Sequence, residues 1–335
     1  MFAHRFVNAF LAPIIFTIVA LLAVGLWGGL EALFIAMLLV VLEITLSFDN
    51  AVVNAKVLAQ LPEIWQRRFL TWGILISVVV TRALLPVIIV AVSTGASIYF
   101  VASIAWSDPG RYGELLRDAH VIINTFGGIF LTLVGLRYFF DKEKQVHWLQ
   151  FIEHRFAKWG AIESIELGLA LLLLLVLAIT LPDARATILF AGLSGVLVFV
   201  LLQGVISAFG VESMKLHSTG FALFAYLNVL DAAFSLDSVV GAFALSTQIP
   251  VIVAGLGAGA YFVRSLTLYM VRHKVLEELV YIEHGAHWAI MGLAGAMIAS
   301  MFVDLPEPVA GLIGLVLVIF AYISSLRVEK RARVT

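Results

Sequence analysis

Long apolar segments separated by short polar stretches run along the whole chain. About 20 apolar residues in a helix are enough to cross the hydrocarbon layer of a bilayer. Residues 93–106 are apolar but too short to span, so we expect them to extend the third helix or to lie at the membrane interface. The pattern predicts an all-α polytopic membrane protein with ten transmembrane helices, at residues 11–29, 31–58, 69–92, 119–140, 163–181, 187–207, 220–246, 250–271, 286–303 and 308–326.

The second and seventh predicted helices carry the same acidic motif. Carboxylates are costly inside a bilayer and persist there mainly where function needs them. The acid–serine–acid pattern returns 188 positions later, first as Glu43, Ser47 and Asp49 and then as Asp231, Ser235 and Asp237. The repetition predicts a duplicated membrane protein with a shared cation site.

At 3.6 residues per turn, each copy of the motif places an oxygen-rich stripe on one face of its helix. The stripes comprise Glu43, Ser47, Asn50 and Asn54 in the second helix, and Asn228, Asp231, Ser235 and Ser238 in the seventh. Asp49 and Asp237 lie beside their stripes, and local unwinding of the helices would bring the acids together. Such oxygens suit the hard cations Mg²⁺, Ca²⁺, Mn²⁺ and Na⁺. Converging acids repel one another unless neutralised, which favours a divalent ion, with protons in the empty state.

The distribution of lysine and arginine predicts the orientation in the membrane. With the N-terminus in the cytoplasm, 16 basic residues fall in inside segments and 3 in outside segments. This bias favours cytoplasmic termini and an even number of spans. The two motif helices then run in opposite directions. We expect two inverted five-helix repeats, residues 1–181 and 182–335, within one membrane domain.

Two arginines and several histidines accompany the motifs. Arg82 and Arg264 lie within the third and eighth predicted helices, where an arginine is rare and usually paired. They could pair with the acids as buried salt bridges, stabilise the packing, or take part in a transport cycle. His120 and His287 begin the fourth and ninth helices. Each is either an interfacial side chain or a proton relay or entry ligand, because histidine titrates near neutral pH.

Composition narrows the class of protein. The 335 residues are 62% hydrophobic and 13% charged, whereas soluble domains are about half apolar and about a quarter charged. The sequence has no cysteine, which excludes disulfides, thiolate metal sites and thiol catalysis. No nucleophile triad, phosphate-binding glycine loop or haem-ligand pair has credible spacing, so we expect no enzyme activity, no tightly bound cofactor and no nucleic-acid partner. The N-terminal segment is interpreted as a retained first helix.

The two motifs resemble those of the TerC family of integral membrane proteins, within the LysE-type transporter superfamily. The resemblance rests on Glu43, Leu46–Asn50 and the string Phe234–Val239, together with the arginine that follows each motif. It implies efflux of Mn²⁺ or a related divalent ion, with the motif acids as ligands. Val240 and Gly241 follow where the family has Pro-Ala, and the extra helices indicate an outlying branch, close to one known only as a domain of unknown function.

We therefore expect a multi-pass exporter of Mn²⁺, or of Ca²⁺ or Mg²⁺, in the inner (plasma) membrane, working by alternating access with protons as counter-ions. The expected metal ligands are Glu43, Asp49, Asn50, Asp231, Asp237 and Ser238. The expected supporting residues are Ser47, Ser235, Asn54, Arg82, Arg264, His120 and His287. A membrane scaffold in an envelope-stress or metal-stress complex and an amino-acid exporter are the alternatives. The expected partners are the cation and the bilayer, and a homo-oligomer is compatible with the sequence.

Overall fold

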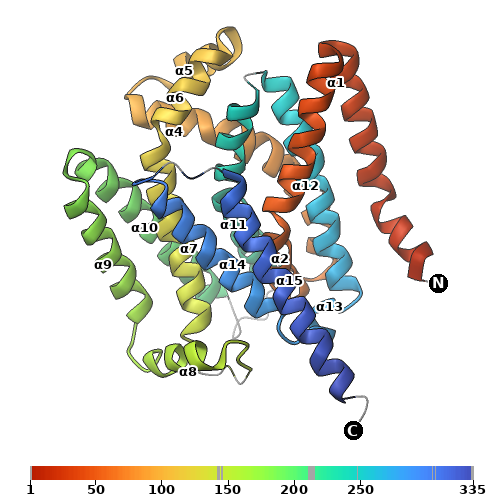
Figure 1. Ribbon diagram of the computed structural model, residues 1–335, viewed down its shortest axis with the longest axis vertical. Helices are drawn as coiled ribbons and strands as arrows, with labels where there is room; N and C mark the ends of the chain where they lie inside the picture. The colour runs from red at the N-terminus through yellow and green to blue at the C-terminus, as the bar shows by residue number, and fades with distance from the viewer. Residues whose placement is uncertain are drawn as a thin grey trace. The chain divides into compact units, whose positions relative to one another are not determined.

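A computed structural model describes residues 2–141, 144, 146–209, 216–246, 248–303, 305 and 307–332 (Figure 1). These residues are helical apart from short connections, and no strand occurs among them. They form two compact units, one from Met1–His120 with Leu216–His273 and the other from Val121–Lys215 with Lys274–Thr335. The predicted all-α class is confirmed.

The first unit contains both acidic motifs. Its helices are α1 (Phe2–Leu46), α2 (Phe48–Ala59), α3 (Glu63–Leu75), η1 (Ile76–Leu84), α4 (Leu85–Thr94), α5 (Ile98–Ser107), α6 (Pro109–Asp118), α11 (Leu216–Leu245) and α12 (Ile249–Arg272).

The second unit contains the remaining apolar helices and one short amphipathic helix, α8. Its helices are α7 (His120–Phe139), α8 (Gln150–Trp159), α9 (Ile165–Thr180), η2 (Pro182–Ala184), α10 (Arg185–Phe209), α13 (Val275–Glu278), α14 (Ile282–Ala299) and α15 (Glu307–Ala332).

The segments predicted to span are helical over most of the length that the structure describes, apart from Ser47 and a few residues at the ends of some segments. Among the described residues, five helices are long and apolar enough to cross a membrane, which indicates an integral membrane protein: Phe10–Leu46, Glu63–Thr94, His120–Phe139, Pro182–Gly204 and Ile249–Arg272. The full set of ten spans stays a prediction. Of residues 93–106, only the first two extend the preceding helix, because Gly95 adopts a left-handed conformation after Thr94 and a separate helix, α5, begins at Ile98.

Gly29 divides α1 into two helical segments. Its φ of 78° and ψ of −170° lie in a region that is essentially restricted to glycine. Figure 1 shows the ribbon of α1 reversing its direction, so that the two segments form a hairpin. The break falls at the last residue of the predicted span 11–29, next to the gap before the span 31–58.

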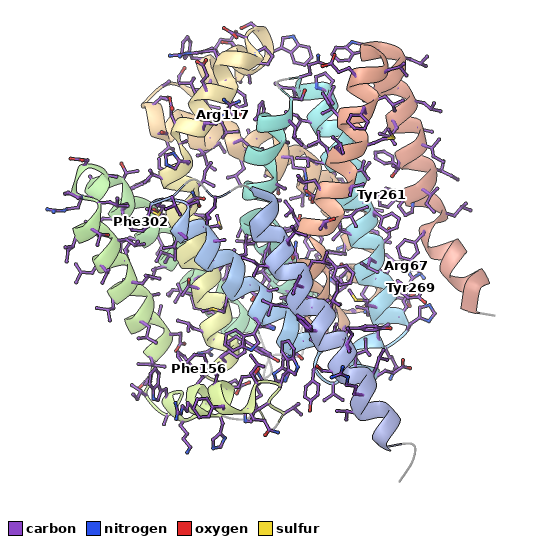
Figure 2. The ribbon with its side chains drawn as sticks, viewed as in Figure 1. Arg67, Arg117, Phe156, Tyr261, Tyr269 and Phe302 are labelled. Carbon is purple, nitrogen blue, oxygen red and sulfur yellow. The ribbon has the colours of Figure 1, made fainter. Side chains whose placement is uncertain are left out.

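The helix α1 packs along α12 in the first unit. Phe10 contacts Tyr269 and Phe16 contacts Tyr261, with ring centroids 5.7 Å and 5.6 Å apart, and both tyrosines are labelled in Figure 2. Gly259 allows a closer approach further along, because a Cβ atom there would lie 2.6 Å from the Cβ atom of Glu43. Small residues permit such packing in membrane proteins. The contact brings the first motif against α12.

Each unit draws helices from both predicted repeats. The first unit combines α1–α6 with α11 and α12, and so brings the two motif helices and the two arginine helices into one body. An inverted repeat is a symmetry relation between two halves of the chain. The division into compact units does not test for such a relation. The inverted repeats, residues 1–181 and 182–335, stay a prediction.

Candidate functional site

Both polar stripes are buried in the first unit. All eight of their residues are less than a tenth exposed: Glu43, Ser47, Asn50, Asn54, Asn228, Asp231, Ser235 and Ser238. The first stripe crosses a local irregularity at Ser47, which separates α1 from α2. Backbone hydrogen bonds from Ser47 N to Glu43 O and from Ala51 N to Ser47 O continue across it. The second stripe lies on α11, which is helical throughout, so the second motif is not unwound and the first departs from helical geometry only at Ser47.

The acid of the first motif forms a buried ion pair with the arginine of the following helix. Glu43 and Arg82 are in direct contact, and both side chains are inaccessible to solvent. Ser47 Oγ donates a 3.0 Å hydrogen bond to Glu43 Oε1. Arg82 also donates to its own helix, at the hydroxyl of Ser77 and at the Ser77 carbonyl 3.0 Å away. These contacts hold the carboxylate and the guanidinium in fixed positions.

The second motif repeats this pairing. Arg264 Nη2 lies 2.7 Å from Asp231 Oδ2, and both side chains are buried. The guanidinium also lies over the ring of Phe69, 4.4 Å from its centroid, which is a favourable cation–π arrangement. Gly73 leaves room for it, because a Cβ atom there would approach Arg264 Nη1 to 2.7 Å. The first acid of each motif is therefore paired with the arginine of its own half of the sequence.

The two ion pairs form a single cluster. Asn50 Nδ2 donates a 3.2 Å hydrogen bond to Asp231 Oδ1, which joins the first motif to the second. Arg264 interacts electrostatically with Asp231, Arg82 and Glu43. Two carboxylates and two guanidinium groups carry no net formal charge, which lowers the cost of burying them together. Of the roles left open by the sequence, pairing of the arginines with the acids is the one observed.

The two arginines differ in the helix that carries them. Arg82 lies in η1, a nine-residue π-helical segment, whereas Arg264 lies in the regular α-helix α12. Extended π-helical segments are rare, and π-helical turns are frequent at functional sites. The Glu43–Arg82 pair is therefore attached to the less regular backbone of the two.

Several buried polar atoms of these residues have no partner among the described residues. Glu43 Oε2, Asn54 Oδ1 and Asn228 Oδ1 receive no hydrogen bond, and Arg82 Nε, Arg264 Nε and Arg264 Nη1 donate none. A buried polar atom left unsatisfied costs about 1–3 kcal/mol. Such atoms call for an explanation, of which a bound ion or ligand is one.

The structure does not describe the side chains of two predicted ligands. The side chains of Asp49 and Asp237 lie outside the described residues. In the part of the chain that is described, no group of three or more histidines and acids is arranged to hold a metal ion. The ligand set predicted from the sequence therefore remains a prediction.

The two predicted histidines have different surroundings. His120 is exposed, and its Nδ1 lies 3.0 Å from the carbonyl of Arg117, one turn earlier. His287 is buried in the second unit, where its ring stacks on that of Tyr138 at 3.5 Å. Nothing in these contacts indicates that the two histidines are equivalent.

A second polar cluster, which the sequence did not reveal, surrounds Glu153 of α8. Its carboxylate accepts hydrogen bonds from His284 Nδ1 at 2.7 Å and from Trp288 Nε1 at 2.9 Å, and Lys144 Nζ lies 3.9 Å away. Burial alone would raise the pKa of Glu153, but these hydrogen bonds and the nearby charges lower it to about 2. His147 also faces this carboxylate at 3.8 Å, and burial lowers the pKa of its imidazole. In the sequence, the only indication of this cluster is an acidic residue on the inner face of a short amphipathic helix.

A family model described as "Protein of unknown function (DUF475)" matches residues 48–332. The chain belongs to the DUF475 family. The DUF475 match contains Asn50, Arg82, Asp231 and Arg264, and it begins five positions after Glu43. Comparisons with curated proteins and with solved structures found no match.

Proposed function

We propose that this DUF475-family protein is a membrane transporter of a hard divalent cation, with Mn²⁺ as the first candidate. The observation that carries the proposal is the set of buried oxygens without a donor, Glu43 Oε2, Asn54 Oδ1 and Asn228 Oδ1, on the stripes that hold the charged cluster. Carboxylate and amide oxygens are the ligands that such cations prefer. A cation bound at Glu43 Oε2 would satisfy that atom and take the place of arginine as the partner of the carboxylate.

In this proposal, the arginines act as internal counter-ions. Arg82 and Arg264 neutralise Glu43 and Asp231 in the two observed ion pairs. Cation binding would release at least one guanidinium from its carboxylate. The Glu43–Arg82 pair is the better candidate to open, because Arg82 lies in a π-helical segment and π-helical turns are frequent at functional sites.

The finer features belong to the same proposal. Asp49 and Asp237 would contribute further ligands, and protons would replace the cation on the acids in exchange. The termini would be cytoplasmic, in the inner (plasma) membrane, with the two repeats inverted so that alternating access operates around the cluster. The resemblance of both motifs to the TerC family supports export of manganese.

An amino-acid exporter is the second candidate. Arg264 Nε and Nη1 and Arg82 Nε are buried donors without an acceptor among the described residues. A substrate carboxylate could accept from such donors while its ammonium group contacts Asp231 or Glu43. A scaffold would use the same ion pairs for stability alone and would transport nothing.

A flux measurement distinguishes these functions. The purified protein is reconstituted into vesicles that contain a manganese-quenched dye, and Mn²⁺ entry is compared with the uptake of labelled lysine. The informative variant is Glu43→Gln with Arg82→Gln, because it removes a charged pair without stranding either partner. The matched control is Glu63→Gln with Arg67→Gln, an exposed pair joined at 2.7 Å.

The proposal expects Mn²⁺ flux in the parent and in the control, and its loss in the buried-pair variant. Lysine uptake without Mn²⁺ flux would favour the amino-acid exporter. If no substrate moves although the protein is folded, the scaffold is favoured.

A further inference from the structure

The helix α8 (Gln150–Trp159) connects two apolar helices without being able to span a membrane. It has ten residues, about half of the length that a transmembrane helix needs. It follows α7 and precedes α9, and Figure 1 shows it running crosswise to both. Because α7 is long and apolar enough to span, α8 lies close in sequence to the end of a membrane-crossing segment.

One face of α8 is firmly attached to the second unit. Glu153 is 1% exposed and accepts backbone hydrogen bonds from Trp148 at 3.0 Å and Leu149 at 3.3 Å, in addition to those from α14. Phe156, labelled in Figure 2, packs against Phe140 with ring centroids 5.7 Å apart. These contacts fix which face of α8 is turned outward.

The outward face combines aromatic and basic side chains. Phe151 is 72% exposed and Trp159 is 52% exposed, although both rings would be expected to avoid water. Arg155 and Lys158 are exposed on the same helix, and the guanidinium of Arg155 lies 4.0 Å from the centre of the Phe151 ring. The only acid of α8 is the buried Glu153, so the charge of this exposed surface is positive.

We infer that the outward face of α8 binds the headgroup layer of an anionic lipid bilayer. Aromatic rings with a polar or charged neighbour are favoured at the depth of the headgroups. Lysine and arginine near such a surface are attracted by anionic lipids, and arginine forms paired hydrogen bonds with phosphate oxygens. Amphipathic helices with a basic polar face typically lie in the plane of the interface. The inference does not depend on what the protein transports.

A fluorescent reporter on a single cysteine tests this inference, because the sequence contains no other cysteine. Ala161→Cys places the reporter in an exposed position just after α8 and leaves its aromatic and basic residues unchanged. The full-length protein is reconstituted into vesicles of phosphatidylcholine with phosphatidylglycerol, or of phosphatidylcholine alone. Quenching by a lipid labelled near its headgroup is compared with quenching by iodide in the water.

In the anionic vesicles, we expect strong quenching by the labelled lipid and protection from iodide. Each basic residue near an anionic surface favours contact about fivefold, so Arg155→Gln with Lys158→Gln should reduce the ratio of lipid-bound to free α8 about 25-fold. The matched control is Arg111→Gln, an exposed arginine of α6, which should change nothing. An unchanged melting temperature in detergent verifies that the variants are folded.

Two results would overturn the inference. Equal quenching in both kinds of vesicle would mean that lipid charge is not recognised. A reporter that iodide reaches freely in every vesicle would mean that α8 faces water or is reserved for a protein partner.

Discussion

Asn50 of α2 donates a 3.2 Å hydrogen bond to Oδ1 of Asp231 in α11, 181 positions later in the sequence. The other carboxylate oxygen of Asp231 contacts Arg264 at 2.7 Å. Asp231 therefore joins the first motif to the arginine of the second half. This contact makes the two motifs parts of one buried polar cluster, which their repetition in the sequence could only suggest.

Replacement of Asn50 by alanine tests the strength of this connection. A hydrogen bond to a buried charged group is typically worth about 1.5–3 kcal/mol, so Asn50→Ala should lower the free energy of unfolding by about that amount. The control is Asn124→Ala, which removes a 3.2 Å hydrogen bond to the uncharged Ser300 hydroxyl and should cost less. Unfolding in mixed micelles gives both values. Equal costs would show that the charge of Asp231 adds nothing to the contact.

Removal of one charge from the Glu43–Arg82 pair should destabilise the protein more than removal of both. Glu43→Gln leaves the buried Arg82 without its counter-charge, which typically costs about 3–5 kcal/mol. The double variant Glu43→Gln with Arg82→Gln leaves no stranded charge and should recover most of that loss. The measurement is a thermal melt of the single, reverse single and double variants. Additive losses would contradict the direct coupling of the two side chains.

The hairpin of α1 should depend on the backbone of Gly29. No atom would lie within 4 Å of a Cβ atom there, so the effect of Gly29→Ala comes from the positive φ alone. The strain of such a conformation is about 1–3 kcal/mol. Gly168→Ala is the matched control, because that position also has open space but lies within the regular helix α9, where alanine should be stabilising by up to about 1 kcal/mol. We expect Gly29→Ala to lower the melting temperature and Gly168→Ala to raise it. If Gly29→Ala did not lower the melting temperature, the conformation of Gly29 would not be the source of strain.

The contribution of Glu153 to stability should depend on pH. Its pKa of about 2 in the folded protein is below the ordinary value of 4.5, so the unfolded chain takes up the proton first. The stabilisation is complete above about pH 5 and is lost as the pH falls towards about 2. Glu153→Gln cannot titrate, so the stability difference between the parent and this variant should shrink between about pH 5 and about pH 3. A constant difference over this range would contradict the depressed pKa.

Much of the helical framework could be predicted from the sequence, because apolar length and helical spacing are local properties. The spacing of Glu43, Ser47, Asn50 and Asn54 predicted one polar stripe, whose four residues the structure shows to be buried. The gap between predicted spans at residue 30 lies next to the turn at Gly29. The separate helix α5 was not predicted, because its start depends on the left-handed conformation of a single glycine.

The partners of the site residues were less predictable, because they depend on how helices pack. Ser77 contacts Arg82 only because the arginine folds back along its own π-helical segment. The hydrogen bond between His284 and Glu153 joins residues 131 positions apart and has no local signal. The sequence left several roles open for the two arginines, and pairing with the acids was one of them. The structure was needed to distinguish between these roles.

We propose that a divalent cation binds to the acids of the buried cluster and releases an arginine. Diffraction at the manganese absorption edge from crystals grown with Mn²⁺ tests this most directly. The account predicts one anomalous peak within about 2–2.6 Å of a Glu43 or Asp231 oxygen, with the guanidinium of Arg82 or Arg264 withdrawn from its carboxylate. The account would be contradicted if, at saturating Mn²⁺, both ion pairs remained closed and the cluster contained no peak.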